Sequence, residues 1–246
     1  MSHPLVLARK WRPKAFSEIV GQEPVRQALS QGLEHGRVHH AYLFTGTRGV
    51  GKTTFARLVA KCFNCAQGIG PNPCGQCVSC VAIQEGRSVD VIEVDAASRT
   101  RIEDTQALLD NIPYAPVQSR FKVYIIDEVH QLSGHSFNAL LKTLEEPPSH
   151  VIFLLATTDP QKLPATVLSR CLKLHLQPIA VPVIAAQLAN ILTAEGISFE
   201  HSALLLLAQA ADGSMRDALS LSEQAIAYAV DGITSAVVET MLGVVS

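Results

Sequence analysis

The chain has 246 residues, of which 48% are hydrophobic, and its formal net charge is −2. This length and apolar content allow one large domain or two ordinary ones, and no Pro, Gly or Ser tract favours disorder. No apolar run is long enough for a membrane helix, and the start carries charge where a signal peptide needs an apolar core, so we expect a soluble cytoplasmic protein without a membrane partner.

The charge is divided unevenly along the chain. Residues 1–179 carry 19 Lys and Arg against 15 Asp and Glu, a net charge of +4, whereas residues 180–246 carry one against seven, a net charge of −6. If the protein touches DNA, the first part does so. A balance of +4 is nevertheless far from a nucleic-acid-binding signature.

Near its start the chain has a basic arm, ARKWRPKAFSEIV, which is interrupted by Pro13. We expect a helix to follow and to end at about residue 36. By itself this arm favours a capping role. Because it precedes a phosphate-binding pattern, it could also line the binding site for the base of a nucleotide, with Val20 and its neighbours.

Residues 43–54, LFTGTRGVGKTT, fit the phosphate-binding pattern G-x-x-x-x-G-K-[ST]. An apolar strand is predicted before this loop and a helix after it, which is the context that the pattern needs. The glycines let successive backbone N–H groups turn towards anionic oxygens. The pattern assigns Lys52 to the β and γ phosphates and the Thr53 hydroxyl to Mg2+, whereas a chance glycine turn would not fill every fixed position.

Five of the six cysteines follow within the next helix and loop. Cys65, Cys74, Cys77 and Cys80 have the spacing C-x8-C-x2-C-x2-C, in which each C-x2-C step lets two thiolates approach one tetrahedral ion. Four thiolates would close the shell of a structural zinc ion, in a small module at about 62–82.

Redox chemistry and a set of reduced bystanders are the alternatives for these cysteines. A disulfide cluster is disfavoured because thiols stay reduced in the cytosol. Cys62 lies one turn before Cys65 and is the fifth cysteine, which this set of four ligands leaves out.

Two further segments predict strands that end in carboxylates. RSVDVIEVDAAS alternates apolar residues with acids, from Val89 to Asp95. FKVYIIDEVHQL predicts a buried strand that ends on Asp127 and Glu128. In nucleotide hydrolases one such carboxylate holds Mg2+ and the next polarises the attacking water, and a buried charge without a role is costly.

Between these strands, Thr100 and Glu103 form a capping box for a helix. Ser98, Arg99, Thr100 and Arg101 therefore cluster at a helix N-terminus, a place suited to a phosphate. A cap with solvated arginines fits the same spacing.

After the second of these strands, Ser133 is expected to cap a helix that Pro147 ends, and VIFLLATTD predicts a buried strand. Its last residues, Thr157 and Thr158, could touch the γ phosphate or the attacking water. Threonine is also a common strand residue, so both side chains could instead be ordinary strand residues without a role in catalysis.

The last third begins with a short helix, Arg170 and a final strand, before Pro178 and Pro182 mark a linker. Helices are expected at about 182–195, 202–211 and 214–230, with part of another from Thr234. Ser214 and Asp217 form a capping box with Arg216 in the first turn. Since the helix dipole disfavours a cation there, Arg216 is expected to bind an anion outside the helix.

Taken together, the glycine loop, DEVH, the polar strand end, Ser169-Arg170-Cys171 and the run from Gly213 to Asp217 resemble the AAA+ family. Within it, the chain resembles gamma/tau subunits of the bacterial DNA polymerase III clamp loader over essentially its whole length. The resemblance implies an α/β fold: a P-loop parallel sheet flanked by helices over 1–179, a small zinc-binding insertion, and an all-α lid over 180–246. It also implies that the collar domain of the family lies beyond residue 246.

The resemblance also implies roles for individual residues. Asp127 and Glu128 would be the Walker B pair, Thr158 would be sensor 1 with Thr157 as the nearby alternative, and Thr53 and Asp127 would hold Mg2+. Arg170 would be an arginine finger in a neighbouring subunit's ATP site, and Arg216 would be sensor 2 in its own. The residues expected to contact ATP are Arg9, Arg12, Val20, Gly46, Thr47, Gly49, Val50, Gly51, Lys52, Thr53, Thr54, Met215 and Arg216.

The implied function is that of the ATP-driven motor subunit of a clamp loader in a DNA polymerase III holoenzyme. Its partners would be further gamma/tau copies, delta, delta prime, the sliding clamp and primed DNA, whose template backbone would meet Arg99 and Arg101. Gln106 and Gly134 stand where relatives often place basic residues, which puts those two DNA contacts in doubt. Without its collar this chain is expected to be monomeric or weakly associated. It is also expected to hydrolyse ATP feebly, because an arginine supplied in trans contributes about 10^3 to 10^5 in rate.

Two other classes compete with this reading. DEVH also resembles a helicase motif, but a DNA helicase or translocase of the two-domain kind needs a second motor domain. A non-hydrolysing structural subunit would show a broken P-loop, and this one is intact.

Overall fold

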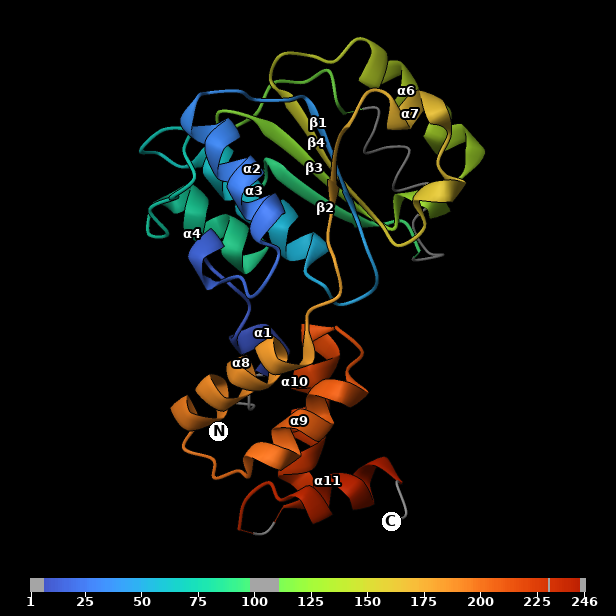
Figure 1. Ribbon diagram of the computed structural model, residues 1–246. Coiled ribbons are helices and arrows are strands. Elements are labelled where there is room, and N and C mark those ends of the chain that lie inside the picture. Colours follow the sequence, from blue (N-terminus) through green and yellow to red (C-terminus); the bar gives the residue numbers. More distant parts are fainter. Residues whose placement is uncertain (1–6, 98–110, 230, 244–246) are drawn as a thin grey trace.

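The computed structural model describes residues 7–97, 111–229 and 231–243. In these residues a parallel sheet carries helices on both faces, and a group of helices lies beyond one end of it (Figure 1). The expected order of an α/β sheet followed by an all-α segment is therefore confirmed.

The sheet has five parallel strands in the order β2-β3-β4-β1-β5. The strands are β1 Ala41–Thr45, β2 Val91–Asp95, β3 Lys122–Asp127, β4 Val151–Thr157 and β5 Leu172–His175. Thr45 pairs with Thr157, and Asp95 pairs with Asp127. The carboxyl ends of β1, β3 and β4 therefore meet at one edge, where open parallel sheets bind ligands.

Alternate strand residues face opposite helical layers. Phe44 and Ile125 pack under the first layer, which consists of α2 Glu23–Glu34, α3 Lys52–Asn64 and α4 Val78–Glu85. Leu43 and Ile126 face the second layer, which consists of α6 Gly134–Glu145 and α7 Ala165–Leu168. Single turns of 3-10 helix occur at η1 Phe16–Glu18, η3 Val129–Gln131 and η4 Pro160–Lys162.

The all-α segment has its own core. Its helices are α8 Val181–Ala194, α9 His201–Ala210, α10 Met215–Tyr228 and α11 Ser235–Leu242, close to the expected bounds. The short α1, Leu7–Lys10, lies with them (Figure 1), and Leu7 is buried in their core. The Trp11 indole N–H and Lys10 donate to the Glu195 carboxylate, each at 2.7 Å. The first helix of the chain is thus bound to the lid, 184 residues further along.

The predicted helix caps at Ser133 and Ser214 are confirmed. The Ser133 hydroxyl accepts from the Ser136 backbone N–H, and the Ser214 hydroxyl accepts from that of Asp217. The capping box at Thr100 lies outside the described residues.

One local prediction is wrong. Val89, expected in the strand, lies before β2 and is 59% exposed. The side chain of the buried Asp90 beside it accepts the backbone N–H groups of Val117, Gln118 and Ser119. In the cysteine-rich segment, Cys77 caps α4, which contains Cys80.

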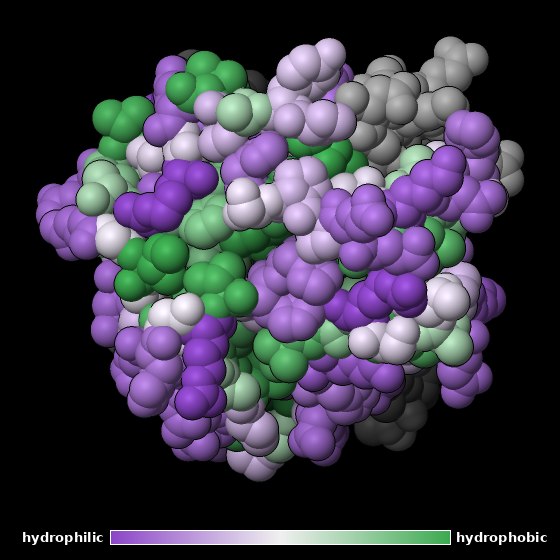
Figure 2. Space-filling view, turned by 90° about the horizontal axis from the view of Figure 1, so that it is seen from above, coloured by the Kyte–Doolittle hydropathy of each residue, from purple (hydrophilic) through white to green (hydrophobic). Residues whose placement is uncertain are grey.

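None of the helices in the described residues is long and apolar enough to cross a membrane. Figure 2 views the end of the molecule that lies uppermost in Figure 1. Hydrophilic side chains dominate this face, and hydrophobic ones show through in separate places between them.

Candidate nucleotide-binding site and cysteine cluster

The glycine loop connects β1 to α3 at the carboxyl edge of the sheet. A Cβ atom on Gly46 would collide with the backbone oxygen of Leu176, so only glycine fits there. Gly51 has φ +108° and precedes Lys52, the first residue of α3. The side chain of Val50 is buried in the core under the loop. This packing fixes the loop in front of the helix N-terminus, where an anion is favoured.

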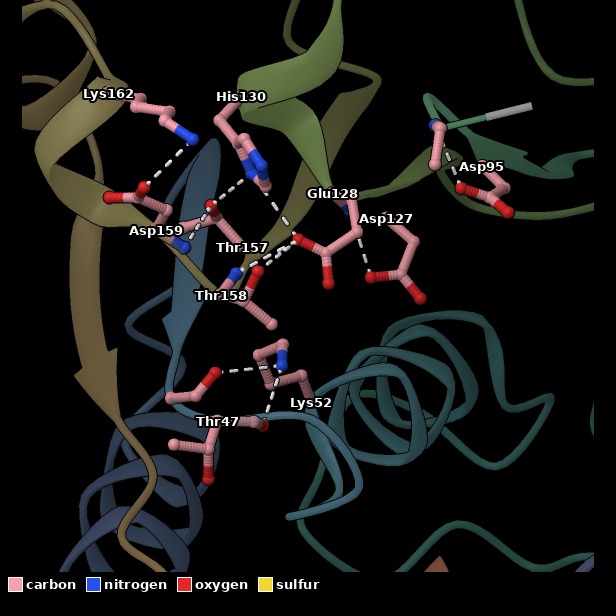
Figure 3. Close-up of polar contacts among 12 residues, drawn as sticks. Thr47, Lys52, Asp95, Asp127, Glu128, His130, Thr157, Thr158, Asp159 and Lys162 are labelled. Carbon is pink, nitrogen blue, oxygen red and sulfur yellow. Dashed lines mark hydrogen bonds and ion pairs between the residues drawn. The ribbon is translucent and has the colours of Figure 1, made fainter. Parts of the chain in front are cut away.

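Lys52 is buried and turned back on the loop. Its Nζ donates to the backbone oxygens of Gly46 and Thr47, each at 2.8 Å (Figure 3). Burial lowers the pKa of Lys52, and the nearby carboxylates of Glu128 and Asp127 act in the opposite direction. The cation therefore lies among the groups predicted to bind phosphate and magnesium.

Thr53 and Asp127 meet across the gap between α3 and β3. The Thr53 hydroxyl donates to Asp127 Oδ2 at 2.6 Å, and Asp127 Oδ1 accepts the backbone N–H of Glu128. Hydroxyl and carboxylate oxygens are the ligands that Mg2+ takes from proteins. These two side chains fit the magnesium site that the sequence predicts.

Glu128 follows β3 in a left-handed conformation, with φ 48° and ψ 46°. Its Oε2 accepts from both the backbone N–H and the hydroxyl of Thr158, at 3.0 and 2.8 Å (Figure 3). A left-handed backbone at a residue other than glycine costs about 1–3 kcal/mol and is concentrated at functional sites. Of the two candidate threonines, Thr158 contacts Glu128, whereas Thr157 is buried and contacts His130.

The lid reaches the glycine loop through the first turn of α10. A Cβ atom on Gly49 would lie 3.4 Å from Cβ of Arg216, whose side chain is exposed. Met215 and Val20 pack against the lid core. In the basic arm, Arg9 is exposed and Arg12 is half-buried.

Arg170 lies just after α7, on the face of the sheet opposite α3. Its guanidinium donates to the Thr166 backbone oxygen at 2.8 Å and to Glu145 Oε1 at 2.9 Å. Thr166 belongs to α7 and Glu145 to α6. In this chain, therefore, the predicted arginine finger is paired with an acid of its own subunit.

The four predicted zinc ligands come together. The sulfur atoms of Cys65, Cys74, Cys77 and Cys80 all lie within 4.8 Å of one another, and Cys62 is not among them. Backbone N–H groups point at the sulfurs, for example from Cys74 to Cys65 at 3.3 Å. Such a set of four thiols fits a closed tetrahedral zinc site.

Two thiols of this region differ in acidity. Burial raises the pKa of the Cys62 thiol to about 12. Burial also opposes ionisation of Cys77, but the backbone N–H groups of Ala66 and Cys80 outweigh it and lower the pKa to about 6. Burial also raises the pKa of the Cys80 thiol, which lies in the cluster. The position of the sulfur atoms, and not their acidity, therefore separates the four candidate ligands from Cys62.

The DNA-contact candidates Ser98, Arg99, Thr100 and Arg101 lie outside the described residues, as does Gln106. Gly134 is the exposed first residue of α6.

The sequence reasoning missed two polar links, one at this site and one between the arm and the lid. One is the contact of His130 with Thr157 and Glu128, although DEVH places that histidine two residues after the glutamate. The other is the Trp11 contact with Glu195, for which no local pattern gives a signal.

Comparison with known families matches nearly the whole chain. A family model described as "DNA polymerase III, delta subunit" matches residues 21–180, and one described as "DNA polymerase III clamp loader subunit, ATPase lid domain" matches residues 183–231.

Curated relatives carry gamma and tau names. DNA polymerase III subunit tau of Escherichia coli is 63% identical over 97% of this chain and 37% of its own length. Subunit tau/gamma of Haemophilus influenzae is 62% identical over 97% of this chain and 35% of its own. Subunit tau of Bacillus subtilis is 46% identical over 92% and 40%. The chain therefore spans little more than a third of the length of these relatives.

Among solved structures, the fold is similar to the Thermotoga maritima RuvB Holliday junction branch migration motor. The TM-score is 0.69 at 23% identity, over 95% of this chain and 72% of that one. At this identity the similarity concerns the fold alone.

Proposed function

Because the chain belongs to the family of DNA polymerase III clamp-loader subunits, we propose that it is the ATP-binding motor part of a gamma/tau subunit. Such a subunit uses ATP binding and hydrolysis to load a sliding clamp on primed DNA. One observation carries the proposal: Lys52, Thr53, Asp127 and Glu128 converge where the carboxyl ends of β1 and β3 meet α3.

ATP would be held by the loop from Gly46 to Thr54. The backbone N–H groups and the N-terminus of α3 would face the phosphates, and Lys52 would exchange its two backbone oxygens for phosphate oxygens. Thr53 and Asp127 would hold Mg2+, which neutralises charge that develops on the phosphoryl oxygens when it is bound. Glu128 would orient the attacking water and take its proton.

Other parts of the chain would complete the site. Arg216 and Met215 from the lid, with Arg9, Arg12 and Val20 from the arm, would contact the nucleotide in the same subunit. Thr158 would serve as sensor 1. The residues proposed to contact DNA are the ones that the sequence predicts: Ser98, Arg99, Thr100 and Arg101.

Arg170 would act on a neighbouring subunit, and this requires assembly. The other subunits would be further gamma/tau copies, delta and delta prime, and in a ring Arg170 would leave Glu145 for the phosphates of the next ATP. We propose that the isolated chain is monomeric and hydrolyses ATP feebly for this reason. The four cysteines would hold a structural zinc ion that ties the end of α3 to α4.

ATP affinity and turnover of the chain, beside Lys52→Ala and Arg170→Ala, test this proposal over a range of protein concentrations. We expect wild-type protein to bind ATP, Lys52→Ala to lose binding, and Arg170→Ala to change neither binding nor the slow turnover of the monomer. Brisk hydrolysis by dilute monomer would instead indicate a self-sufficient motor.

A further inference from the structure

Three polar groups converge on one oxygen of the Glu128 carboxylate. The backbone N–H and hydroxyl of Thr158 lie 3.0 and 2.8 Å from Oε2, and Nδ1 of His130 lies 3.3 Å from the same atom (Figure 3). Among the described residues, no hydrogen bond ends on Oε1. The carboxylate is therefore held by one oxygen, and the other is left to face the site.

His130 holds this carboxylate from a fixed position. It belongs to η3, its side chain is 8% exposed, and Nδ1 lies 2.8 Å from the hydroxyl of Thr157. Thr157 is fully buried at the end of β4, and its hydroxyl oxygen also accepts the backbone N–H of Asp159 at 3.1 Å. The imidazole is thus anchored to the sheet by a side chain that cannot move away.

The hydrogen-bonding capacity of these groups determines where the imidazole carries its hydrogen. An ionised carboxylate can only accept, so a favourable contact with Glu128 Oε2 requires a hydrogen on Nδ1. The same nitrogen lies 2.8 Å from the Thr157 hydroxyl oxygen, which can also accept a hydrogen from it. A lone pair on Nδ1 would instead face the carboxylate and repel it.

We propose that His130 is a positioning residue for ATP hydrolysis, which acts through Glu128. Together with Thr158 it occupies Oε2 and so presents Oε1 to the attacking water. This inference rests on the proposed function, since it requires Glu128 to act on that water. His130 touches neither the glycine loop nor Lys52 in the contacts of the described residues, so its loss is expected to change the rate and not the affinity for ATP.

Two amide side chains separate positioning from packing. His130→Asn places an amide N–H near the position of Nδ1, whereas His130→Gln places its amide near the position of Nε2. If the Nδ1 hydrogen bond matters, Asn restores function and Gln does not. If His130 only fills space, the two variants behave alike.

The experiment measures single-turnover ATP hydrolysis with protein in excess over ATP, together with ATP affinity at equilibrium. We expect His130→Ala and His130→Gln to slow hydrolysis about tenfold to a hundredfold, as expected for a misplaced catalytic group, with ATP affinity within twofold of wild type. His130→Asn is expected to stay within about threefold of wild type by the same argument. Thr157→Val, which keeps the imidazole and removes its anchor, is expected to slow hydrolysis at unchanged affinity even if the His130 variants fail to fold.

Equal rates for His130→Asn and His130→Ala, or a parallel loss of ATP affinity, would overturn the inference. Glu128→Gln is the reference that separates it from the proposed function. If that variant hydrolyses ATP as wild type does, the proposed function fails and the inference fails with it. If Glu128→Gln is inactive while His130→Ala and Thr157→Val keep the wild-type rate, only the inference fails.

Discussion

The hydroxyl of Ser214 occupies the space that a Cβ atom on Gly49 would need. Ser214 is buried and caps α10 by accepting the backbone N–H of Asp217, so it is not free to turn aside. The glycine loop and the lid therefore touch at a point where one of them has no side chain.

We expect Gly49→Ala to destabilise the chain and to weaken ATP binding, because the new methyl group pushes the lid away from the loop. Gly196→Ala is the matched control, since Gly196 also has a positive φ, +71° against +77°, but has no atom within 4 Å of its Cβ position. The left-handed backbone costs each variant about 1–2 kcal/mol. The collision should add to this only in Gly49→Ala, which thermal unfolding and ATP titration would detect. Equal melting temperatures and affinities for the two variants would contradict the expected contact.

Local sequence patterns were sufficient to predict those parts of the fold and the site whose residues are neighbours in the chain. The glycine loop, the acids at the end of β3, the four cysteines and the caps at Ser133 and Ser214 are each contained in one short segment. Even so, the bounds of single elements depend on more than pattern. Val89 fits the alternation of a strand but lies outside β2, and the carboxylate of Asp90 beside it binds a loop 27 to 29 residues away, which no local pattern indicates.

The sequence could not predict contacts between distant segments. The arm from Leu7 to Trp11 precedes the sheet domain, yet it packs in the core of the lid. No spacing rule links Trp11 to Glu195, and the same holds for Gly49 with Ser214 and for His130 with Thr157. These links arise from tertiary packing.

We predict about one zinc ion per chain by elemental analysis, and Cys77→Ser should reduce it markedly because a closed site needs all four thiolates. Cys62→Ser is the control, since Cys62 is equally close in sequence but outside the cluster. Chelation should lower the melting temperature of wild type, because metal binding contributes to folding. Metal-free protein that melts at the same temperature, or equal zinc loss from both variants, would contradict this site.

We predict that Trp11 fluorescence reports on the contact between the arm and the lid, because the chain has a single tryptophan. Glu195→Ala removes the acceptor of the indole N–H and should move the emission to longer wavelength. Glu195→Gln keeps an acceptor oxygen and should change it less.

Contacts from Lys10 and then Trp11 lower the pKa of Glu195. The wild-type emission should therefore stay constant on acidification to the usual carboxyl range, about pH 4, and change only below it. An emission spectrum that is the same in all three proteins would show that the arm is not held by Glu195.

The last prediction concerns Asp90. It is 1% exposed, and three backbone N–H groups donate to its carboxylate at 2.6, 2.8 and 2.7 Å. Burial alone would raise the pKa of Asp90, but the N–H groups of Val117, Gln118 and Ser119 outweigh it and hold the pKa below its ordinary value of 3.8. The ionised form is therefore the one that the fold stabilises.

We expect Asp90→Asn to lose about 2–4 kcal/mol at pH 7, since its single amide oxygen cannot satisfy three donors. At about 2–4 °C per kcal/mol, the melting temperature should fall by about 5–15 °C. A carboxyl group with a depressed pKa contributes its stability above the unfolded pKa and loses it as the pH falls through the folded pKa. The difference between wild type and Asp90→Asn should therefore be constant from pH 7 to about 5 and shrink below pH 4.

Asp95→Asn is the control for this experiment, because Asp95 is exposed and, among the described residues, accepts from only one backbone N–H, that of Ala97 at 3.0 Å. It should shift the melting temperature little at any pH, as surface substitutions do. A deficit of Asp90→Asn that is as large at pH 3.5 as at pH 7 would mean that its cause is lost packing and not the charge on the carboxylate.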